Sequence, residues 1–345
     1  MKSKYLSLLR GISVFSLVVC IGPSAFSRHS SGAALIQEPA KPNISPAEAK
    51  AVKAINTAPD AAGKLAAAGE FVKKYPKSSL REQVASYVAG QIAQVTDATQ
   101  KLSLAEGFQK VFKDGKEAEE IQLITLDAYL GLKRIDDAFA HAAIILAKEP
   151  ENVAVMSHLA LAGTEEAKRQ NAKHVPVSLQ YGLKSIELIE ANKKPANLDD
   201  ARWESQKAML PMLYLNMGIL SLVSSNPADA KARFEKASAL NPAEPTSYAL
   251  LANMVDEEYQ QLAQTYRTMP DGKQKEETLK KATERMDQAI DLYARALGAS
   301  AGKPEHKKLE EQLLQAITPY YKYRHNGSTE GLQPLIDKYK TPATP

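Results

Sequence analysis

The chain has 345 residues, of which 44% are apolar and only 6% aromatic, and its formal net charge is +4. This length fits two or three compact domains, or one elongated array of repeats. A single cysteine excludes a disulfide-stapled scaffold, so the hydrophobic core must hold the fold. The small net charge lacks the basic excess of a nucleic-acid-binding protein, and we expect no nucleic-acid partner.

Residues 1–27 have the layout of a secretory signal peptide. Basic residues precede an uncharged apolar run from Ile12 to Ile21, and Ala25-Phe26-Ser27 has small residues where a signal peptidase reads them. The run is too short for a permanent transmembrane helix. We therefore predict a mature protein without a membrane span, exported to the periplasm or the extracellular space. An uncleaved membrane anchor and a lipid anchor at Cys20 remain alternatives, although Val19 fits poorly before a modified cysteine.

Cleavage after Ser27 changes the balance of the chain. Removing three of the 44 basic residues leaves 41, against 40 acidic residues, and it also removes the only cysteine. The mature protein is then expected to be nearly neutral and without a thiol. Residues 28–44 lack periodicity and are predicted to form a flexible leader.

A helical domain is predicted over residues 45–340, followed by a short tail at 341–345. Its start is marked by Ser45-Pro46-Ala47-Glu48, which combines a serine N-cap, a proline at the first helical position and a glutamate three residues after the cap. From there to about residue 340 the sequence has helical periodicity and no alternating strand pattern of useful length.

The predicted helices fall into about seven antiparallel pairs. Their ranges are 46–57 with 60–75, 79–95 with 98–113, 117–131 with 135–148, 152–170 with 175–192, a fifth pair within 199–244, a sixth within 245–302, and 304–324 with 329–340. In the fifth pair, a first helix that starts at Asp199 runs through Pro211, which predicts a kink. In the sixth pair, the turn residues Pro270-Asp271-Gly272 sit within an insertion of about two dozen residues and predict one long hairpin.

Residues 211–244 carry the most specific motif of the chain. Its marked positions are Tyr214, Met217, Gly218, Ser221, Ala230, Phe234, Ala237 and Pro242. Twelve residues separate Gly218 from Ala230 and Ala230 from Pro242, and the same steps join Leu126, Ala138 and Pro150. The motif resembles one 34-residue tetratricopeptide repeat (TPR), with Tyr214 at the usual Trp, Met217 at the Leu and Ser221 at the Tyr.

The resemblance, to exported bacterial-type TPR proteins, implies an all-α fold. It also implies an α-solenoid whose stacked pairs form a right-handed superhelix with a concave face. Repeats of this kind build binding scaffolds and seldom carry chemistry. Gly182 and Ser185 are expected to be small contact residues of the fourth pair. In the fifth pair, the resemblance implies that four residues pack against the second helix of their own pair: Tyr214, Met217, Gly218 and Ser221.

The opposite flank of that helix would face the concave groove. It consists of Met212, Leu215, Ile219 and Leu222. Some family members grip a peptide's terminal carboxylate with Lys and Asn on this flank, but Asn216 alone is present here, so we do not expect that ligand. Trp203, next to Arg202, is a candidate aromatic anchor for a partner. Two alternatives remain open: the groove is filled by the chain itself, and Trp203 is buried within the fold.

Enzyme signatures lack their structural context. Gly298-Ala-Ser300-Ala-Gly302 matches the nucleophile-elbow string, but no strand precedes it. None of the six histidines forms an i, i+4 pair, although His141 and His158 lie on consecutive predicted helices, and no phosphate-binding glycine loop occurs. We therefore expect no catalytic, cofactor-binding or metal-binding residues.

The run Tyr320-Tyr321-Lys322-Tyr323-Arg324-His325 is the densest aromatic and basic cluster. Nucleic-acid bases stack on such tyrosines in some proteins. We favour a capping helix instead, in which Tyr320 and Tyr323 pack inward while the basic residues stay in water.

These expectations predict a non-catalytic scaffold that binds a protein or peptide partner outside the cytoplasm, through Met212, Leu215, Asn216, Ile219, Leu222 and Trp203. The alternative is a structural component of a cell-envelope assembly or secretion complex, held through the convex side or the sixth hairpin. A hydrolase would need converging acids or a nucleophile–base pair, and the sequence presents neither.

Overall fold

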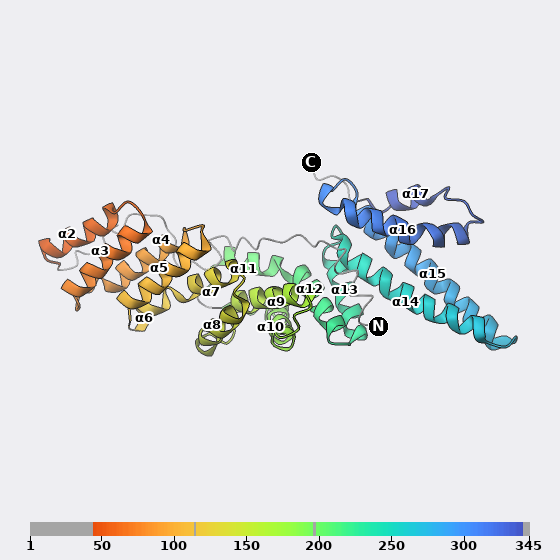
Figure 1. Cartoon of the computed structure of the whole chain (residues 1–345), viewed down its shortest axis with the longest axis horizontal. Helices are drawn as coiled ribbons and strands as arrows, with labels where there is room; N and C mark the ends of the chain where they lie inside the picture. Colours follow the sequence, from red (N-terminus) through yellow and green to blue (C-terminus); the bar gives the residue numbers. More distant parts are fainter. Residues whose placement is uncertain (1–43, 114, 196–197, 341–345) are drawn as a thin grey trace. The chain divides into compact units, whose positions relative to one another are not determined.

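A computed structural model describes residues 44–113, 115–195 and 198–340 (Figure 1). The predicted signal peptide, nearly all of the leader and the tail lie outside these residues. Throughout the described part of the chain the regular elements are helices and no strand occurs, which confirms the predicted all-α class. The helices divide into two compact units with a boundary after Val155, the N-terminal unit before it and the C-terminal unit after it.

The N-terminal unit consists of α2 (Pro46–Thr57), α3 (Ala61–Lys74), α4 (Arg81–Ala93), α5 (Ala98–Val111), α6 (Gly115–Glu119), α7 (Gln122–Gly131) and α8 (Ile135–Lys148). The predicted helix start at Ser45-Pro46 is confirmed, because the Ser45 side chain accepts a hydrogen bond from the Glu48 amide at 3.2 Å. Helix α2 packs against α3, α3 against α4 and α5, α5 against α7, and α7 against α8. Their shared core includes the buried residues Ile55, Phe71, Ile92 and Phe108.

One predicted helix of this unit is two helices. The sequence predicts a continuous helix over 117–131, but α6 ends at Glu119 and α7 begins at Gln122. A continuous helix would place Glu117 and Ile121 on one face, since residues four apart are neighbours on a helix surface. The break lets Ile121 lie fully buried in the core while Glu117 pairs with Arg81.

The C-terminal unit begins within α9 (Val153–Lys168) and continues with α10 (Val175–Glu190), α11 (Asp200–Ala208), α12 (Leu210–Val223), α13 (Pro227–Leu240), α14 (Pro245–Thr268), α15 (Lys273–Ser300), the 3₁₀ helix η1 (Pro304–His306), α16 (Lys307–Arg324) and α17 (Leu332–Asp337). Helix α12 packs against α10 and α13, α14 against α13 and α15, and α15 against α16 and α17. The core of this unit includes Phe234, Leu250, Tyr293 and Ile317.

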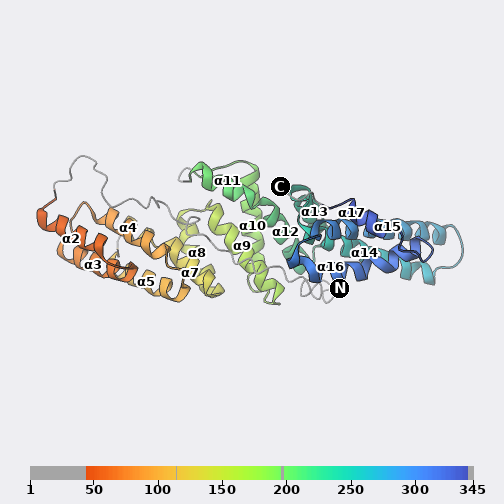
Figure 2. The ribbon, with the colours of Figure 1, turned by 90° about the horizontal axis from the view of Figure 1, so that it is seen from above.

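In this unit, Pro211 and Gly272 mark two places where the direction of the chain changes between helices. Helix α11 ends at Ala208 and α12 begins at Leu210, so Pro211 lies in the first turn of a new helix rather than at a kink. A proline is well placed there because the first amides of a helix have no partner within the helix. The predicted long hairpin is confirmed: Figures 1 and 2 show α14 and α15 side by side, joined by a turn with Gly272 at a φ of 149°.

Candidate functional site

Helix α12 carries most of the residues that the sequence predicts for partner binding. It is apolar on nearly every face, as expected for a helix surrounded by others. Leu213, Met217 and Leu220 have no exposed surface. Helices α10, α11 and α13 all contact α12, so only part of its surface remains for a partner.

Gly218 and Ser221 join α12 to the second helix of the same pair, as the resemblance implies. A Cβ atom at Gly218 would lie 2.4 Å from the ring of Phe234, so only glycine lets α13 come this close. The Ser221 hydroxyl accepts a hydrogen bond from the Arg233 guanidinium and donates one to the Met217 carbonyl at 2.7 Å. The predicted packing of Gly218 and Ser221 is confirmed.

Tyr214 and Met217 connect α12 to α10, a contact that the sequence did not reveal. The Met217 thioether fills a notch at Gly182, where a Cβ atom would lie 2.1 Å from the sulfur. The Tyr214 hydroxyl donates to Glu190 Oε1 at 2.6 Å. Burial, together with this bond to a carboxylate, raises the pKa of Tyr214 above its usual value. The prediction that Gly182 is a small contact residue is confirmed.

The predicted groove flank of α12 divides into a buried and a partly exposed set. Ile219 is 1% exposed and belongs to the core formed with α13, α14 and α15, while Leu215 and Leu222 are half-buried against the same core. Asn216 is buried, and its side-chain nitrogen donates to the Met212 carbonyl at 2.7 Å. Ile219 and Asn216 are therefore covered by the chain itself, which leaves Met212, Leu215 and Leu222 partly exposed.

Trp203 lies inside the fold, which is the alternative that the sequence left open. It is 3% exposed, and its indole nitrogen donates to Asn192 Oδ1 at 3.0 Å. Asn192 follows the end of α10 with a φ of 49°, a conformation that asparagine tolerates better than most residues. Trp203 thus fixes α11 to the end of α10, and its ring is not presented to a partner.

Tyr320, in the tyrosine cluster of α16, forms a polar contact with α14. The Tyr320 hydroxyl donates to the Asp256 carboxylate on α14 and accepts from Gln260 Nε2 at 2.6 Å. The ring of Tyr259 meets the ring of Tyr320 edge-on, with the centroids 5.3 Å apart. The sequence missed this contact because its partners are about sixty residues apart.

The capping prediction for α16 is correct for Tyr320 and wrong for Tyr323, which is 71% exposed. The buried side chains of this helix are Leu309, Leu313, Ile317 and Tyr321, each four residues after the last. Residues at this spacing share one helix face, so Tyr321 takes the inward position that we expected for Tyr323.

A cleft of about 590 Å³ opens on the long hairpin. It is lined by Glu258, Gln261, Leu262, Thr265, Lys281, Glu284 and Arg285. Glu258 pairs with Arg285 at 2.7 Å and lies 3.7 Å from the ammonium of Lys231 on α13. The cleft thus mixes both charge signs, and its charges partly compensate one another.

The string that resembled a nucleophile elbow lies at the end of α15. Ser300 is fully buried, and its hydroxyl donates to the Ala296 carbonyl at 2.9 Å. A Cβ atom at Gly298 would lie 2.5 Å from the backbone of Tyr339, which explains the glycine by close approach of the chain. This geometry gives Ser300 a structural role.

His141 has a structural environment in the N-terminal unit. Its Nε2 lies 2.9 Å from the Gln122 carbonyl, and its ring meets Tyr129 edge-on. Burial lowers the pKa of His141, so the ring is neutral at neutral pH. In the described ranges, no group of three His, Cys, Asp or Glu residues is arranged to hold a metal ion. None of the helices described here combines the length and apolar character needed to cross a membrane.

No protein-family model matches the chain, and no curated protein matches it. The resemblance to TPR proteins therefore depends on the motif at 211–244 and on the twelve-residue steps.

Proposed function

We propose that this protein is a non-catalytic, TPR-like α-solenoid that binds a protein or peptide partner outside the cytoplasm. The proposal of a repeat scaffold is supported by the pairing of successive helices within each unit and by the close approach of Gly218 to Phe234 at the position where the TPR motif has its glycine. Export is supported by the layout of residues 1–27.

The observation that carries the binding proposal is the partly exposed apolar strip on α12, formed by Met212, Leu215 and Leu222. Steps of three and seven residues place these side chains on one helix face. Leu215 and Leu222 also rest on the buried core of the C-terminal unit. They are therefore held in fixed positions, and a partner that covers them loses little side-chain entropy at this surface.

A partner of suitable chemistry is an amphipathic helix or an extended peptide with apolar side chains. Such a segment buries its apolar side against a groove, with anchors at helical spacing in the first case. Asn216 does not contribute, because its amide is already bonded to its own helix.

The test compares capture of a partner by the wild-type protein and by a Leu215→Asp, Leu222→Asp variant. Partners are taken from the native envelope fraction and identified by mass spectrometry. Ile219 is left unchanged, because a buried aspartate at a position with 1% exposure would unfold the protein. The matched control is Leu279→Asp, which changes an exposed leucine of the long hairpin.

We expect the double variant to lose the partner, while the Leu279→Asp protein retains it. Fluorescence of the single tryptophan, Trp203, checks that the C-terminal unit stays folded in each variant. Equal capture by all three proteins would remove the α12 strip from consideration.

The alternative role, a structural component of an envelope assembly or secretion complex, is favoured by the long hairpin. Its two helices have 24 and 28 residues, and its outer half presents the open cleft and the exposed Leu279. Deleting residues 266–280 separates the two roles. Lost assembly with retained peptide capture supports the structural role, and lost capture with intact assembly contradicts it.

A further inference from the structure

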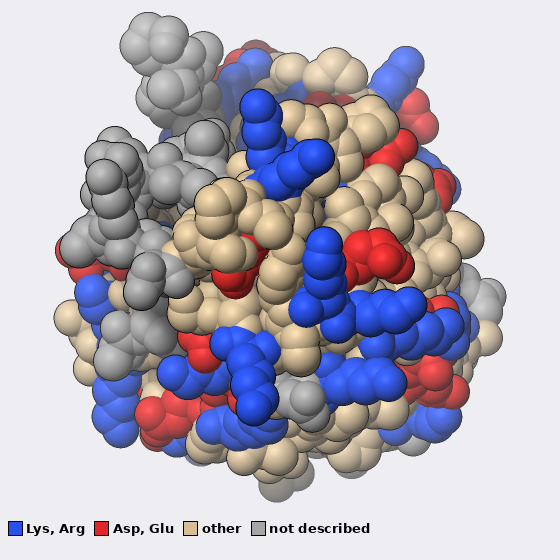
Figure 3. Space-filling view, turned by 90° about the vertical axis from the view of Figure 1, so that its left-hand side faces the viewer, with Lys and Arg blue, Asp and Glu red and all other residues tan. Residues whose placement is uncertain are grey.

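Six lysines gather at one end of the N-terminal unit. They are Lys73, Lys74, Lys77, Lys110, Lys113 and Lys116, and we call them the lysine end. All six are exposed, and none forms an ion pair with a described carboxylate. Figure 3 views the side that lies on the left in Figure 1, and Lys and Arg are more frequent than Asp and Glu over the lower half of the view.

The packing of α3 and α5 explains why these lysines lie together. A Cβ atom at Gly107 would lie 3.1 Å from Leu65, and one at Gly69 would lie 3.5 Å from Val111. Both contacts advance by four residues in the same direction, so α3 and α5 run parallel and their C-terminal ends meet. Lys73 and Lys74 end α3, while Lys110 is in the last turn of α5.

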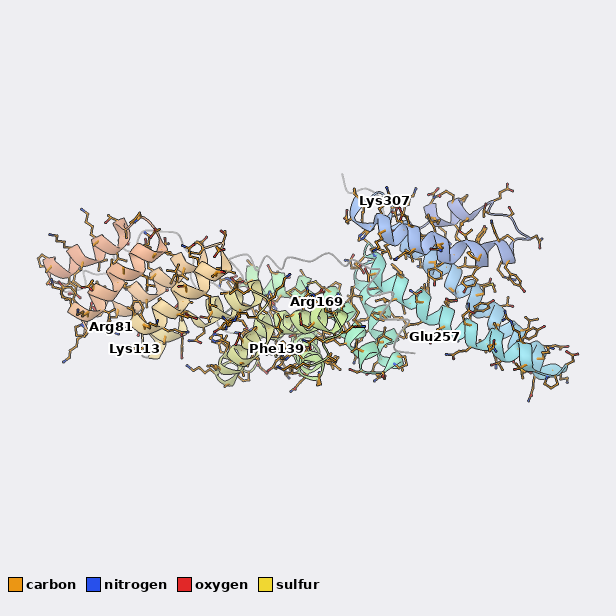
Figure 4. All side chains as sticks on the ribbon, in the orientation of Figure 1. Arg81, Lys113, Phe139, Arg169, Glu257 and Lys307 are labelled. Atoms are coloured by element: carbon orange, nitrogen blue, oxygen red, sulfur yellow. The ribbon has the colours of Figure 1, made fainter. Side chains whose placement is uncertain are left out.

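An ion pair fixes the remaining lysines to the same end. Arg81 at the start of α4 donates to both carboxylate oxygens of Glu117 on α6, at 2.8 and 2.7 Å, and to the Pro76 carbonyl at 3.0 Å. This clamp holds the loop with Lys77 beside the segment with Lys113 and Lys116. In Figure 4, Arg81 and Lys113 lie on the same side of the unit.

The helix dipole accounts for the positions of only three of the six lysines. Lysines in a last helical turn, such as Lys73, Lys74 and Lys110, stabilise the negative end of the helix. Lys77 and Lys113 lie outside helices, and Lys116 lies in α6, a single turn of five residues with little macrodipole to compensate. Acidic residues also lie on these segments. Glu117 pairs with Arg81 and Glu119 with Lys148, whereas Glu70, Glu82 and Glu106 are exposed.

We propose that the lysine end binds the anionic surface of a phospholipid bilayer. On membrane-adjacent segments, clusters of four to eight basic residues mark sites for anionic lipid, and each Lys or Arg near such a surface contributes about 1 kcal/mol. Lysine presents a compact, hydrated charge on a flexible stem, which suits a fluid surface of many phosphates.

Two other anionic partners fit less well. The large exposed apolar side chains of the described residues lie elsewhere, at Ile144, Leu183, Leu240, Leu279, Leu314 and Tyr323. The lysine end therefore offers neither an apolar anchor for an acidic peptide nor an exposed ring on which a base can stack. This peripheral binding is independent of the proposed peptide capture, because it uses residues of the other unit.

The test measures cosedimentation of the full chain with vesicles of phosphatidylcholine alone or mixed with phosphatidylglycerol. The variant Lys77→Gln, Lys113→Gln, Lys116→Gln removes the three lysines that the helix dipole does not explain. The matched control, Lys236→Gln, Lys280→Gln, Lys308→Gln, removes three exposed lysines of the C-terminal unit. Residues 1–43 are present in every protein, so the difference between variants reports the lysine end.

We expect the wild type and the control to bind the phosphatidylglycerol vesicles at low salt, and the lysine-end variant to bind about 100-fold more weakly. Raising the salt to about 1 M, where the Debye length is about 3 Å, should abolish this difference. Equal binding by both variants, or a difference that persists on phosphatidylcholine alone, would overturn the proposal. The proposal would also be overturned if the wild type did not bind the vesicles but bound polyglutamate or single-stranded DNA more tightly than the lysine-end variant does.

Discussion

The two units use different polar contacts to join their helices. In the N-terminal unit, charged pairs link different helices: Arg81 with Glu117, and Lys101 with Asp127. In the C-terminal unit, ion pairs between helices lie at the surface, as Glu258 with Arg285 and Asp287 with Arg324 do. The less exposed contacts there are tyrosine hydroxyls that donate to carboxylates, as Tyr320 does to Asp256 and Tyr339 to Asp291. A phenol is neutral, whereas a guanidinium or an ammonium is charged. Removing the charged pair from water therefore costs more free energy than removing the tyrosine contact.

This difference predicts which contacts are fragile. Glu117 is 8% exposed, so its charge depends on Arg81 for compensation. Asp256 and Asp291 are only half-buried. When the tyrosine is lost, water compensates the charge of Asp256, and Arg295 still pairs with Asp291 at 2.7 Å. The N-terminal unit should therefore be sensitive to the loss of one ionic partner, and the C-terminal unit chiefly to changes in apolar packing.

The largest effect is expected for Arg81→Met. It leaves the Glu117 carboxylate buried and unpaired, which should lower the free energy of unfolding by about 3–5 kcal/mol. Urea unfolding followed by circular dichroism measures this change. The double variant Arg81→Met, Glu117→Met should recover much of the loss, because it removes the orphaned charge. A double variant as unstable as Arg81→Met alone would contradict this explanation.

The next effect tests close packing in the C-terminal unit. Gly218→Ala places a methyl group against the rigid ring of Phe234 and should destabilise the unit by about 1–3 kcal/mol. Gly182→Ala meets the flexible end of Met217 instead, so a smaller loss is expected. Urea unfolding monitored by Trp203 fluorescence compares the two. A larger loss of unfolding free energy for Gly182→Ala than for Gly218→Ala would contradict the idea that the Met217 side chain moves aside more easily than the Phe234 ring.

A smaller effect is expected for Tyr320→Phe, which keeps the ring against Tyr259 and removes only the hydroxyl. The loss should be about 0.5–1.5 kcal/mol, because the hydroxyl's two hydrogen bonds, to Asp256 and from Gln260, are partly exposed and water replaces them. The same fluorescence measurement applies, with Tyr323→Phe as the control because Tyr323 is exposed. A loss as large as that of Arg81→Met would remove the contrast between the two units.

The smallest effect is a dependence on pH in the N-terminal unit. The pKa of His141 is lowered by burial, so below the unfolded pKa of about 6.5 the unfolded chain binds more protons than the folded one. Stability should therefore fall as the pH drops below this value. Melting temperatures of the wild type and His141→Gln at mildly acidic and neutral pH test the sign. An identical pH dependence in both proteins would exclude His141 as the source.

Local signals of the sequence predicted the helices well. The cap at Ser45 and the turn at Gly272 are properties of a few adjacent residues, and both lie where the sequence placed them. The proline at 211 was also detected, but its consequence was misjudged, because a helix break and a kink have the same local signature. At the break between α6 and α7, Glu117 pairs with Arg81, which lies thirty-six residues earlier, and no local pattern contains that information.

The candidate site was predicted only in part, for the same reason. The spacing placed Met212, Leu215, Ile219 and Leu222 on one face, but which of them the core of the C-terminal unit covers depends on tertiary packing. Trp203 gave no local sign of its bond to Asn192. The lysine end is likewise invisible in the sequence until the parallel packing of α3 and α5 is known.

The most direct test of partner binding at α12 is site-specific photo-crosslinking. A photoreactive phenylalanine analogue is introduced at Leu215, and in a separate protein at Leu279, and the crosslinked partner is identified by mass spectrometry. We predict that one partner crosslinks from position 215 and not from position 279. Crosslinking of that partner from position 279 alone would contradict our account and assign binding to the long hairpin.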